Sequence, residues 1–485
     1  MTVNPSRATI AKSLDDAKLS VFHLKAAVTA GAGFFTDSYD LNVIGTVTLL
    51  ITPQFHLGSG QVAMLTSSTL LAVAVGAMFF GRLGDLLGRR RVYGLEAVLM
   101  ITGALVSALA PNFVVLLVGR LVLGIGIGGD YPASGVIMTE YANARNRGRL
   151  VGLTFIFYVF GQVSAYLVSL LVVAVGVPDD LAWRLILGLG VLPSLLVLHQ
   201  RRHMPESPRW TAHSGDPARA ARDLAAFAQL TVTPEPTRQP LQPSDHQPDR
   251  PSAPERAHVG RAAAAELSKR RLLSTLAGTA GSWFFYNVAV YGINVSQPLL
   301  LKNIVPHATM VTNLALNAVL VVCFSLSGGI LGVVALDRLP RRTQQAAGFG
   351  LCALAMTLIT VVPGLSATVL PFAVTFGLSL FGSIFGPNYT TMLIAAESYP
   401  TPVRSTFHGL SSGIAKVGAF TGALVVPLIL AGGGLRIVTL IAAVCFLAGT
   451  ATTFLVREPG GRTLEDVGEA LALTPSAPRE DVLSV

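Results

Sequence analysis

The chain has 485 residues, of which 52% are hydrophobic and only 13% are charged, and its mean hydropathy is +0.60. Because an average soluble domain carries about 25% charged residues, this composition excludes an ordinary soluble protein and indicates a polytopic membrane protein. The formal net charge of +9 does not indicate nucleic-acid binding, since the basic residues cluster between apolar segments and serve there as a topology signal.

The first 25 residues are polar and mixed in charge, without a short apolar core and a cleavage site. We therefore expect no cleaved signal peptide. Cys323, Cys352 and Cys445 each lie within an apolar segment, far apart in sequence and without the spacing of metal ligands. We interpret them as small buried hydrophobic residues, and we expect no metal and no cofactor.

Apolar segments of about 20 residues, the length that crosses a bilayer, occur in two groups of six on either side of a long polar stretch. The first group comprises residues 24–50, 61–81, 92–110, 113–137, 150–175 and 183–199. The second group comprises residues 272–295, 311–336, 344–362, 369–395, 409–430 and 435–456. The sequence therefore predicts an all-α polytopic membrane protein with twelve transmembrane helices in two six-helix halves.

This pattern divides the chain into an N-terminal tail, a first half, a linker, a second half and a C-terminal tail. Their predicted ranges are 1–23, 24–199, 200–271, 272–456 and 457–485. Lys and Arg concentrate in alternate loops, so the positive-inside rule places both tails and the linker in the cytoplasm. We expect a protein of the plasma (inner) membrane. The Pro-dense residues 234–254 of the linker are predicted to be disordered, and a short helix is expected at 217–230.

The two halves repeat a short loop in which an acidic residue precedes a basic cluster. Residues 81–90 read GRLGDLLGRR, and residues 332–342 read GVVALDRLPRR. The need for cytoplasmic positive charge explains the arginines but not the acidic residues. We therefore expect salt bridges at Asp85 and Arg89, and at Asp337 and Arg341, to close a cytoplasmic gate.

The fourth apolar segment is rich in glycine, which lets neighbouring helices approach closely, and it contains Asp130 at membrane depth. A carboxylate there costs roughly 2.5–3.5 kcal/mol, which indicates that it faces a polar cavity. This segment resembles the tenth one, pairing Glu140 with Glu397, Arg147 with Arg404 and Asp130 roughly with Asn388. Two similar halves are expected to enclose a site near the middle of the membrane.

Two further sets of ionisable residues lie at membrane depth. Asp37 and Asp40 are three residues apart and so share a helix face, where two adjacent carboxylates are not expected to be ionised together. A water-exposed pair near a helix end is the alternative. Glu96 and Arg120 carry opposite charges, and a static ion pair that holds two helices together is one interpretation of them.

In the seventh segment, Trp283, Asn287 and Tyr291 recur every four residues and so share one face. Aromatic residues at this spacing often form only core or a membrane-interface belt, but the asparagine between them favours a hydrated face. Their indole, amide and phenol groups are hydrogen-bond donors that a polar solute could use. Lys416 is a lone cation in the eleventh segment, and one interpretation is that it reaches toward the membrane surface near the cytoplasmic end.

The loop GRLGDLLGRR resembles the loop motif of the major facilitator superfamily. The run GIGIGGDYPASGVIMTE resembles the hallmark of its phosphate:proton symporter family, as do AGAGFFTDSYDL, GSWFFYNVAVYG and FGPNYTTMLIAAESYPTPVRSTFHG. The resemblance implies the major facilitator fold, with two pseudo-symmetric halves, and phosphate import coupled to protons by alternating access. It implies a proton-handling group of Asp37, Glu96, Arg120 and Asp130, with Asp40 beside it. It places the substrate at Tyr131, Gln162, Trp283, Asn287, Tyr291 and Asn388, with Lys416 near the pathway.

Position 287 departs from the family, which usually has Asp there. Asn donates a hydrogen bond without carrying a proton, so binding is expected to persist with an altered proton stoichiometry, unless a related anion is the substrate. Two alternatives remain: a proton-coupled symporter of an organic anion or sugar, and a non-transporting nutrient receptor. The sequence contains no nucleotide-binding loop or nucleophile motif, so we expect no enzyme. We expect a monomer whose partners are phosphate, protons and lipid.

Overall fold

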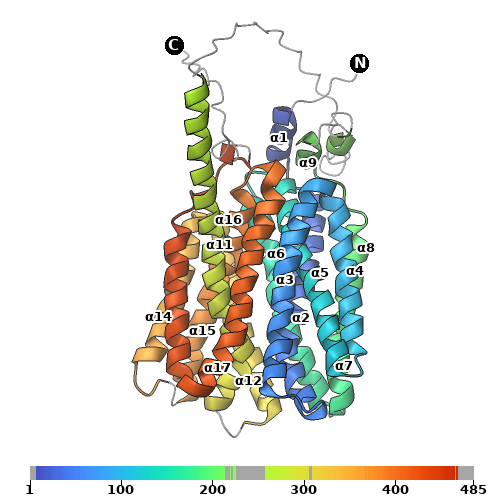
Figure 1. Ribbon diagram of the computed structural model, residues 1–485, viewed down its shortest axis with the longest axis vertical. Coiled ribbons are helices and arrows are strands. Elements are labelled where there is room, and N and C mark those ends of the chain that lie inside the picture. The colour runs from blue at the N-terminus through green and yellow to red at the C-terminus, as the bar shows by residue number, and fades with distance from the viewer. Residues whose placement is uncertain are drawn as a thin grey trace.

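The computed structural model describes residues 7–213, 219, 222–225, 257–304, 308–365, 368–464 and 466–467. These residues form helices and contain no β-strand. Ten segments among them are long and apolar enough to cross a membrane, and two more long helices are α2 (Val21–Gln54) and α11 (Ala257–Ile304). The helices stand side by side in an elongated bundle (Figure 1). The prediction of an all-α protein with twelve spans is confirmed.

The first half contains five unbroken spanning helices and one that is interrupted. The unbroken helices are α2, α3 (Ser59–Leu87), α4 (Arg89–Ala108), α5 (Phe113–Tyr141) and α6 (Arg147–Ala174). The sixth span consists of α7 (Asp179–Leu189) and α8 (Val191–Arg201), which meet at Gly190. A Cβ atom on Gly190 would lie 2.6 Å from Asp40 Oδ1, so this break brings the α2 carboxylate against the α7–α8 backbone.

The second half has more interruptions than the first. Its spans are α11; α12 (Met310–Leu320), the π-helical η1 (Val321–Leu326) and α13 (Ser327–Leu336); α14 (Arg341–Val361); α15 (Val369–Phe385) and α16 (Pro387–Glu397); and α17 (Arg404–Thr453), which follows the short η2 (Thr401–Val403). The last helix contains the two final spans, which meet at Gly434 with φ of 74°. Glycine adopts this left-handed conformation at little cost.

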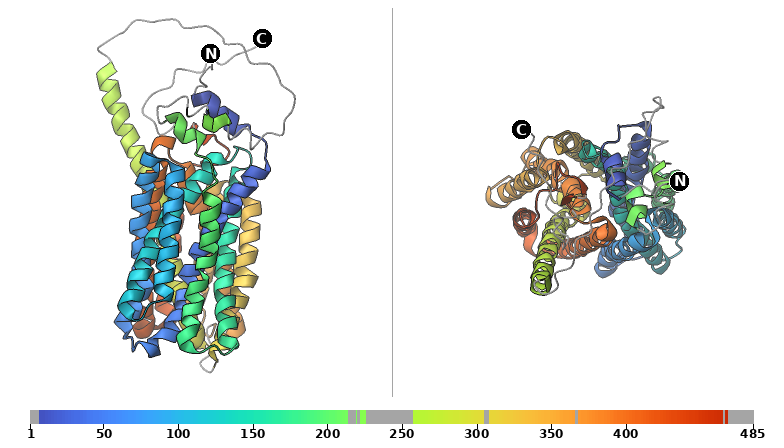
Figure 2. Two further views of the ribbon diagram at one scale, coloured as in Figure 1. Left: turned by 90° about the vertical axis from the view of Figure 1, so that its right-hand side faces the viewer. Right: turned by 90° about the horizontal axis from the view of Figure 1, so that it is seen from above.

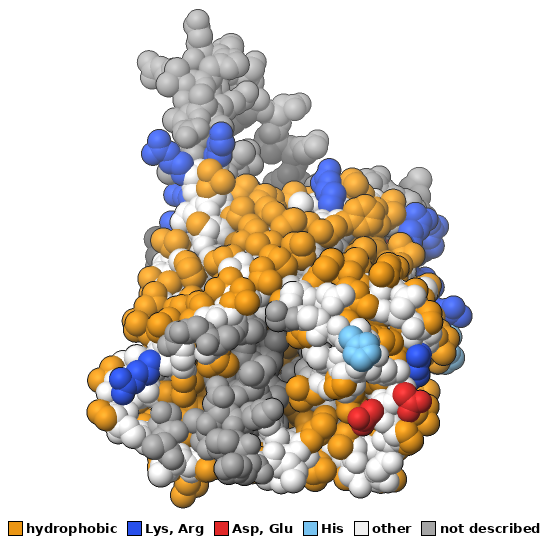
Figure 3. Space-filling view, turned by 60° about the horizontal axis from the view of Figure 1, so that its bottom comes forward, with side chains coloured by type: hydrophobic (Ala, Val, Ile, Leu, Met, Phe, Trp, Pro, Cys, Tyr) orange, Lys and Arg blue, Asp and Glu red, His pale blue; other side chains and the backbone are white. Residues whose placement is uncertain are grey.

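Glycines on α5 allow close packing in the first half, as the sequence predicts. A Cβ atom on Gly124 would lie 2.6 Å from the Thr69 carbonyl oxygen on α3, and one on Gly126 would lie 2.8 Å from the Glu96 carbonyl oxygen on α4. The α5 backbone thus touches two neighbouring backbones. The flank of the bundle carries a broad band of hydrophobic side chains, as expected of a surface that faces lipid (Figure 3).

Two short helices, α1 (Arg7–Asp15) and α9 (Pro208–His213), lie across one end of the bundle, which we call the α1 end (Figure 2). Ile10 and Leu14 of α1 are buried there. Seen from above, the helices of the two halves form neighbouring groups (Figure 2). Residues 234–254, predicted to be disordered, lie outside the described residues, and of 217–230 only 219 and 222–225 are described.

Candidate functional site

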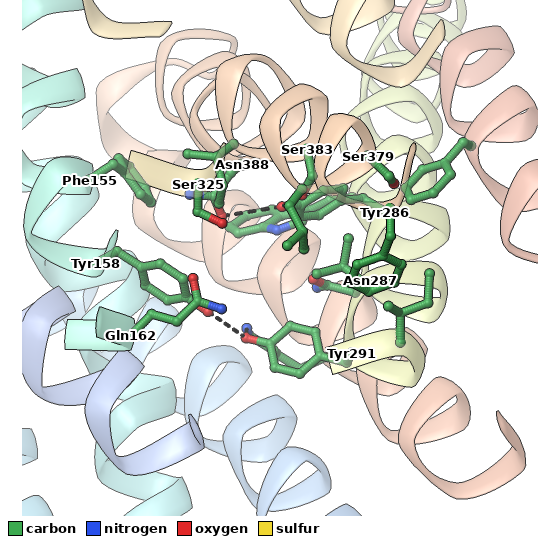
Figure 4. A pocket seen from close by; sticks show the side chains of 18 of the residues that line it. Phe155, Tyr158, Gln162, Tyr286, Asn287, Tyr291, Ser325, Ser379, Ser383 and Asn388 are labelled. Carbon is green, nitrogen blue, oxygen red and sulfur yellow. Dashed lines mark hydrogen bonds between the residues drawn. The ribbon is translucent and has the colours of Figure 1, made fainter. Parts of the chain in front are cut away.

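A central cavity lies between the halves and is lined from α5 and α6 on one side and from α11, η1, α15, α16 and α17 on the other (Figure 4). Its polar lining includes Tyr158, Tyr286, Ser325, Ser379 and Ser383. All seven residues that the sequence assigned to the substrate also line it: Tyr131, Gln162, Trp283, Asn287, Tyr291, Asn388 and Lys416. The structure therefore brings these residues, which come from five helices, together around one space.

Among the described residues that line this cavity, Lys416 is the only Lys, Arg, His, Asp or Glu. Its Nζ atom donates hydrogen bonds to the hydroxyl groups of Tyr131 at 3.0 Å and Tyr291 at 2.8 Å. It also lies 4.3 Å and 4.6 Å from the centres of these two rings, a cation–π arrangement. The side chain is buried, so Lys416 does not reach toward the membrane surface and instead gives the cavity a positive charge.

The cavity retains unused hydrogen-bonding groups. Tyr158 and Tyr291 approach through their hydroxyl groups at 3.4 Å, and Tyr286 shares a hydrogen bond of 2.9 Å with Ser383 (Figure 4). The Nδ2 atoms of Asn287 and Asn388 are buried and have no hydrogen-bond partner among the described residues. Since a buried polar group is costly when unpaired, these amides are suited to donate to a bound solute.

A buried ion network lies beside the cavity and is centred on Arg201. Its guanidinium contacts Glu96 Oε1 at 2.7 Å and Asp130 Oδ1 at 2.5 Å, and all three side chains are fully buried. Ser134 donates to Asp130 at 2.5 Å, and the Tyr93 ring centre lies 4.1 Å from the guanidinium carbon. Asp130 does not line the cavity, but its neighbour Tyr131 does.

The sequence analysis missed Arg201, because it placed this residue in the cytoplasmic linker. The sixth span extends to Arg201 as α8, so the guanidinium lies within the bundle. The sequence carried one signal: Arg120 lies ten residues from Asp130 on the same helix, so Asp130 needs another cation, and Arg201 lies two residues after the sixth apolar segment.

The predicted approach of Glu96 and Arg120 is wrong. Arg120 and Asp130 lie ten residues apart on α5, about 15 Å along a helix, so Arg120 cannot join the group around Asp130. Arg120 instead donates to the Asp40 carbonyl oxygen at 2.9 Å and interacts electrostatically with the Asp40 carboxylate. The single predicted proton-handling group is therefore two groups, one around Arg201 and one around Arg120.

Asp37 lies between the Arg201 network and the cavity. Its carboxylate interacts electrostatically with Asp130, Arg201 and Lys416, yet neither of its oxygens has a hydrogen-bond partner among the described residues. Asp37 and Asp40 are both buried, which excludes a water-exposed pair. Gly33, one turn before Asp37, packs directly against Arg201 and Asp130, and no space remains there for a Cβ atom.

At the α1 end, the two repeated loops close the bundle. Asp85 pairs with Arg89 at 3.0 Å and accepts hydrogen bonds from the backbone N–H and the hydroxyl of Thr406, at the start of α17, at 2.7 and 2.6 Å. Asp337 pairs with Arg341 at 3.6 Å and accepts from the backbone N–H of Arg149, in the first turn of α6, at 3.2 Å. Each acidic residue thus stabilises a helix N-terminus of the opposite half.

Two buried glutamates reinforce this closure. Glu140 contacts Arg89 of its own half at 3.0 Å and Arg404 of the other half at 3.2 Å. Glu397 contacts Arg341 of its own half at 3.6 Å and Arg147 of the other half at 3.8 Å. The sequence identified Glu140 and Glu397 as repeat partners but assigned them no role.

Outside the membrane-spanning segments, burial raises the pKa of the Asp337 carboxyl, an effect that Arg341 partly offsets.

The chain is similar to a known protein family and to several named transporters. A family model described as sugar (and other) transporter matches residues 25–471. The repressible high-affinity phosphate permease of Neurospora crassa is 32% identical, over 96% of this chain and 89% of the relative. Inorganic phosphate transporter 1-6 of Oryza sativa subsp. japonica is 33% identical, over 96% of each chain. The low affinity inorganic phosphate transporter 4 of Lotus japonicus is 32% identical, over 98% of this chain and 97% of the relative.

Solved structures share the fold. The structure of XylE, a proton:xylose symporter of the major facilitator superfamily, matches with a TM-score of 0.76 at 19% identity, over 93% of this chain and 99% of that one. An inward open structure of XylE from E. coli matches with a TM-score of 0.65 at 18% identity, over 93% and 99% of the two chains.

Proposed function

The chain belongs to the sugar (and other) transporter family of the major facilitator superfamily, and we propose that it imports inorganic phosphate together with protons by alternating access. Its relatives are named as transporters or permeases, and the similarity covers about nine tenths or more of each relative, so the protein is a transporter and not an enzyme. The names of these relatives support phosphate as the substrate.

The buried Lys416 is the observation that carries the proposal. Phosphate is an anion at neutral pH, and its oxygens need a cation and several hydrogen-bond donors in a dehydrated site. Lys416, Asn287 and Asn388 supply one positive charge and two unpaired amide donors around one cavity. A neutral sugar requires no buried cation, so this arrangement favours an anion.

Charge balance supports coupling to protons. Around Arg201 and Lys416, the acidic side chains of Asp37, Glu96 and Asp130 exceed the basic ones by one. One proton on Asp37, which has no hydrogen-bond partner among the described residues, would neutralise the group. A bound phosphate would compete with Asp37 for the positive charge of Lys416 and would thereby favour protonation of Asp37. With the inside negative, each excess proton adds about 2.3 kcal/mol per 100 mV to the driving force.

Alternating access would follow from rocking of the two halves about this cavity. The ion pairs of Glu140 and Glu397 join the halves at the α1 end, so that end is closed here. The basic loops support placing the α1 end in the cytoplasm and the protein, as a monomer, in the plasma (inner) membrane. In that orientation the structure is closed toward the cytoplasm.

Uptake of radiolabelled phosphate into liposomes that contain the purified protein tests this function. We expect an inward proton gradient to drive phosphate accumulation, and we expect Lys416→Gln to reduce uptake at least tenfold while Lys416→Arg retains part of it. Absence of phosphate uptake by correctly folded wild-type protein would contradict the proposal and would favour a receptor or another substrate.

A second candidate is a proton-coupled symporter of another small anion, and Asn287 is the observation that favours it. An amide at this position accepts as well as donates hydrogen bonds, so it suits a partly protonated or esterified anion. Competition for labelled phosphate uptake by a panel of anions at two pH values separates the two candidates. Inorganic phosphate should compete best at both pH values if the first candidate is correct.

A further inference from the structure

A second groove lies at the α1 end of the second half, between the start of the spanning part of α11 and the segment that follows α17. It is lined by basic, hydroxyl and apolar groups: Arg271, Ser274, Thr275, Ser398, Leu455, Val456, Arg457, Glu458, Pro459, Arg462 and Val467. None of these residues lines the central cavity. The groove is therefore a separate space.

Three arginines give this groove a positive charge. Arg271, Arg457 and Arg462 are exposed, and none of them has an ion-pair partner among the described residues. An arginine fork binds phosphate oxygens in a planar, two-point geometry. Three unpaired guanidinium groups around one groove therefore offer more donors than a single surface charge would.

Among the described residues that line the groove, the one acidic side chain is already engaged elsewhere. Glu458 accepts hydrogen bonds from the backbone N–H groups of Arg341 at 2.9 Å, Arg342 at 3.0 Å and Gly460 at 2.9 Å. Its carboxylate is thus directed at the N-terminus of α14 and forms no ion pair with the three arginines of the groove among the described residues.

A buried hydroxyl provides an independent indication of a ligand. Ser398 is 3% exposed and lines the groove, and its Oγ atom has no hydrogen-bond partner among the described residues. Thr275 of α11, which is 9% exposed, also lines the groove and carries a second hydroxyl. Buried hydroxyl groups normally find a partner, so the unpaired Ser398 hydroxyl is available to a ligand in the groove.

We propose that this groove is a binding site for a phosphate-bearing anion, either the headgroup of an anionic phospholipid or inorganic phosphate. Basic pockets at the cytoplasmic ends of transmembrane helices suit such headgroups. The site touches the gate: Arg147, which pairs with Glu397, also donates to the Arg462 carbonyl oxygen at 3.2 Å. Ser398 directly follows Glu397 in the chain. An anion in the groove thus stabilises the closed α1 end.

Thermal unfolding of the full chain in neutral detergent tests the proposal. Dioctanoyl phosphatidylglycerol is titrated against dioctanoyl phosphatidylcholine, and inorganic phosphate is titrated at constant ionic strength in the Lys416→Gln background, which removes the central cation. We expect one of the two anions to raise Tm saturably. The triple variant Arg271→Gln, Arg457→Gln and Arg462→Gln should weaken that effect at least tenfold, and Ser398→Ala about threefold.

A second triple variant, Arg82→Gln, Arg91→Gln and Arg202→Gln, removes the same charge from exposed positions of the first half and serves as the control. Loss of the phosphatidylglycerol effect in the groove variants alone identifies a lipid site, and the same loss for inorganic phosphate identifies a free-anion site. The proposal is overturned if neither anion raises Tm saturably, or if both triple variants weaken the effect equally. Neither result bears on transport through the central cavity.

Discussion

The guanidinium of Arg201 lies 2.5 Å from the carboxylate of Asp130 in the membrane-spanning part of the first half, and both side chains are fully buried. The same guanidinium pairs with Glu96 at 2.7 Å. One cation from the last turn of α8 therefore holds acidic residues of α4 and α5. This makes the network dependent on the position of α8.

Replacement of Arg201 by Ala should strongly destabilise the protein. It leaves the carboxylates of Glu96 and Asp130 buried without their cation, and removing one partner of a buried pair costs about 3–5 kcal/mol. We expect a large fall in Tm and loss of phosphate uptake. The exposed neighbour Arg202→Ala is the control and should change neither quantity measurably. Equal Tm values for the two variants would show that the buried pairs contribute nothing to stability.

Replacement of Gly33 by Ala should displace the Arg201 network. A Cβ atom at this position would collide with Arg201 Nη2 and Asp130 Oδ2, and forcing extra atoms into a packed site costs about 1–3 kcal/mol. Gly45→Ala on the same helix is the matched control, because nothing lies within 4 Å of a Cβ atom there. We expect Gly45→Ala to keep wild-type uptake and Gly33→Ala to lose most of it. An uptake rate that is unchanged in Gly33→Ala would refute the close approach of α2 and α8.

Replacement of Asp85 by Asn should loosen the first turn of α17. The substitution removes the carboxylate that accepts hydrogen bonds from the Thr406 N–H and hydroxyl and that pairs with Arg89. Losing a helix-terminal acceptor costs about 0.5–2 kcal/mol of stability. Hydrogen–deuterium exchange at residues 404–408 should accelerate severalfold. Asp180→Asn, at an exposed site on α7, is the control and should leave this exchange unchanged. Unaltered exchange in Asp85→Asn would mean that other contacts hold the α1 end closed.

Replacement of Asn287 by Asp should change the pH dependence of uptake. An ionised carboxylate in the cavity repels phosphate, so binding would then require a proton on that residue. We expect uptake to be retained at acidic pH and to fall more steeply than in the wild type as the pH rises, and Asn287→Ala should lower uptake at every pH. Initial rates at a series of pH values measure this. Superimposable wild-type and Asn287→Asp profiles would show that position 287 does not meet the substrate.

The sequence predicted the parts of the fold that depend on segment length and composition. Twelve apolar segments, the repeat that relates Glu140 to Glu397, and the close packing of glycines on α5 are properties of local pattern. The resemblance to a family named seven of the residues that line the central cavity. Each of these features can be recognised without knowledge of which helices touch.

The ion pairs were harder to predict, because they depend on helix neighbours and on axial position. In the sequence, Arg120 is the basic residue that lies within an apolar segment next to the one that contains Glu96. Its position on α5 is ten residues from Asp130, so the two side chains lie at different depths in the bundle. Arg201 reaches the depth of Asp130 because α8 continues past the apolar segment. The contact of Asp85 with Thr406 joins residues that are 321 positions apart. Such contacts arise only when the halves pack together, and no pattern within one half encodes them.

Asp37→Asn in liposomes is the most direct test of the central claim, that a buried carboxylate beside Lys416 couples protons to anion movement. Phosphate accumulation under an inward proton gradient is measured together with phosphate exchange when no gradient is present. We predict that Asp37→Asn keeps exchange within a few-fold of the wild type but no longer responds to the gradient. Accumulation by Asp37→Asn that rises with the gradient as it does in the wild type would contradict this account.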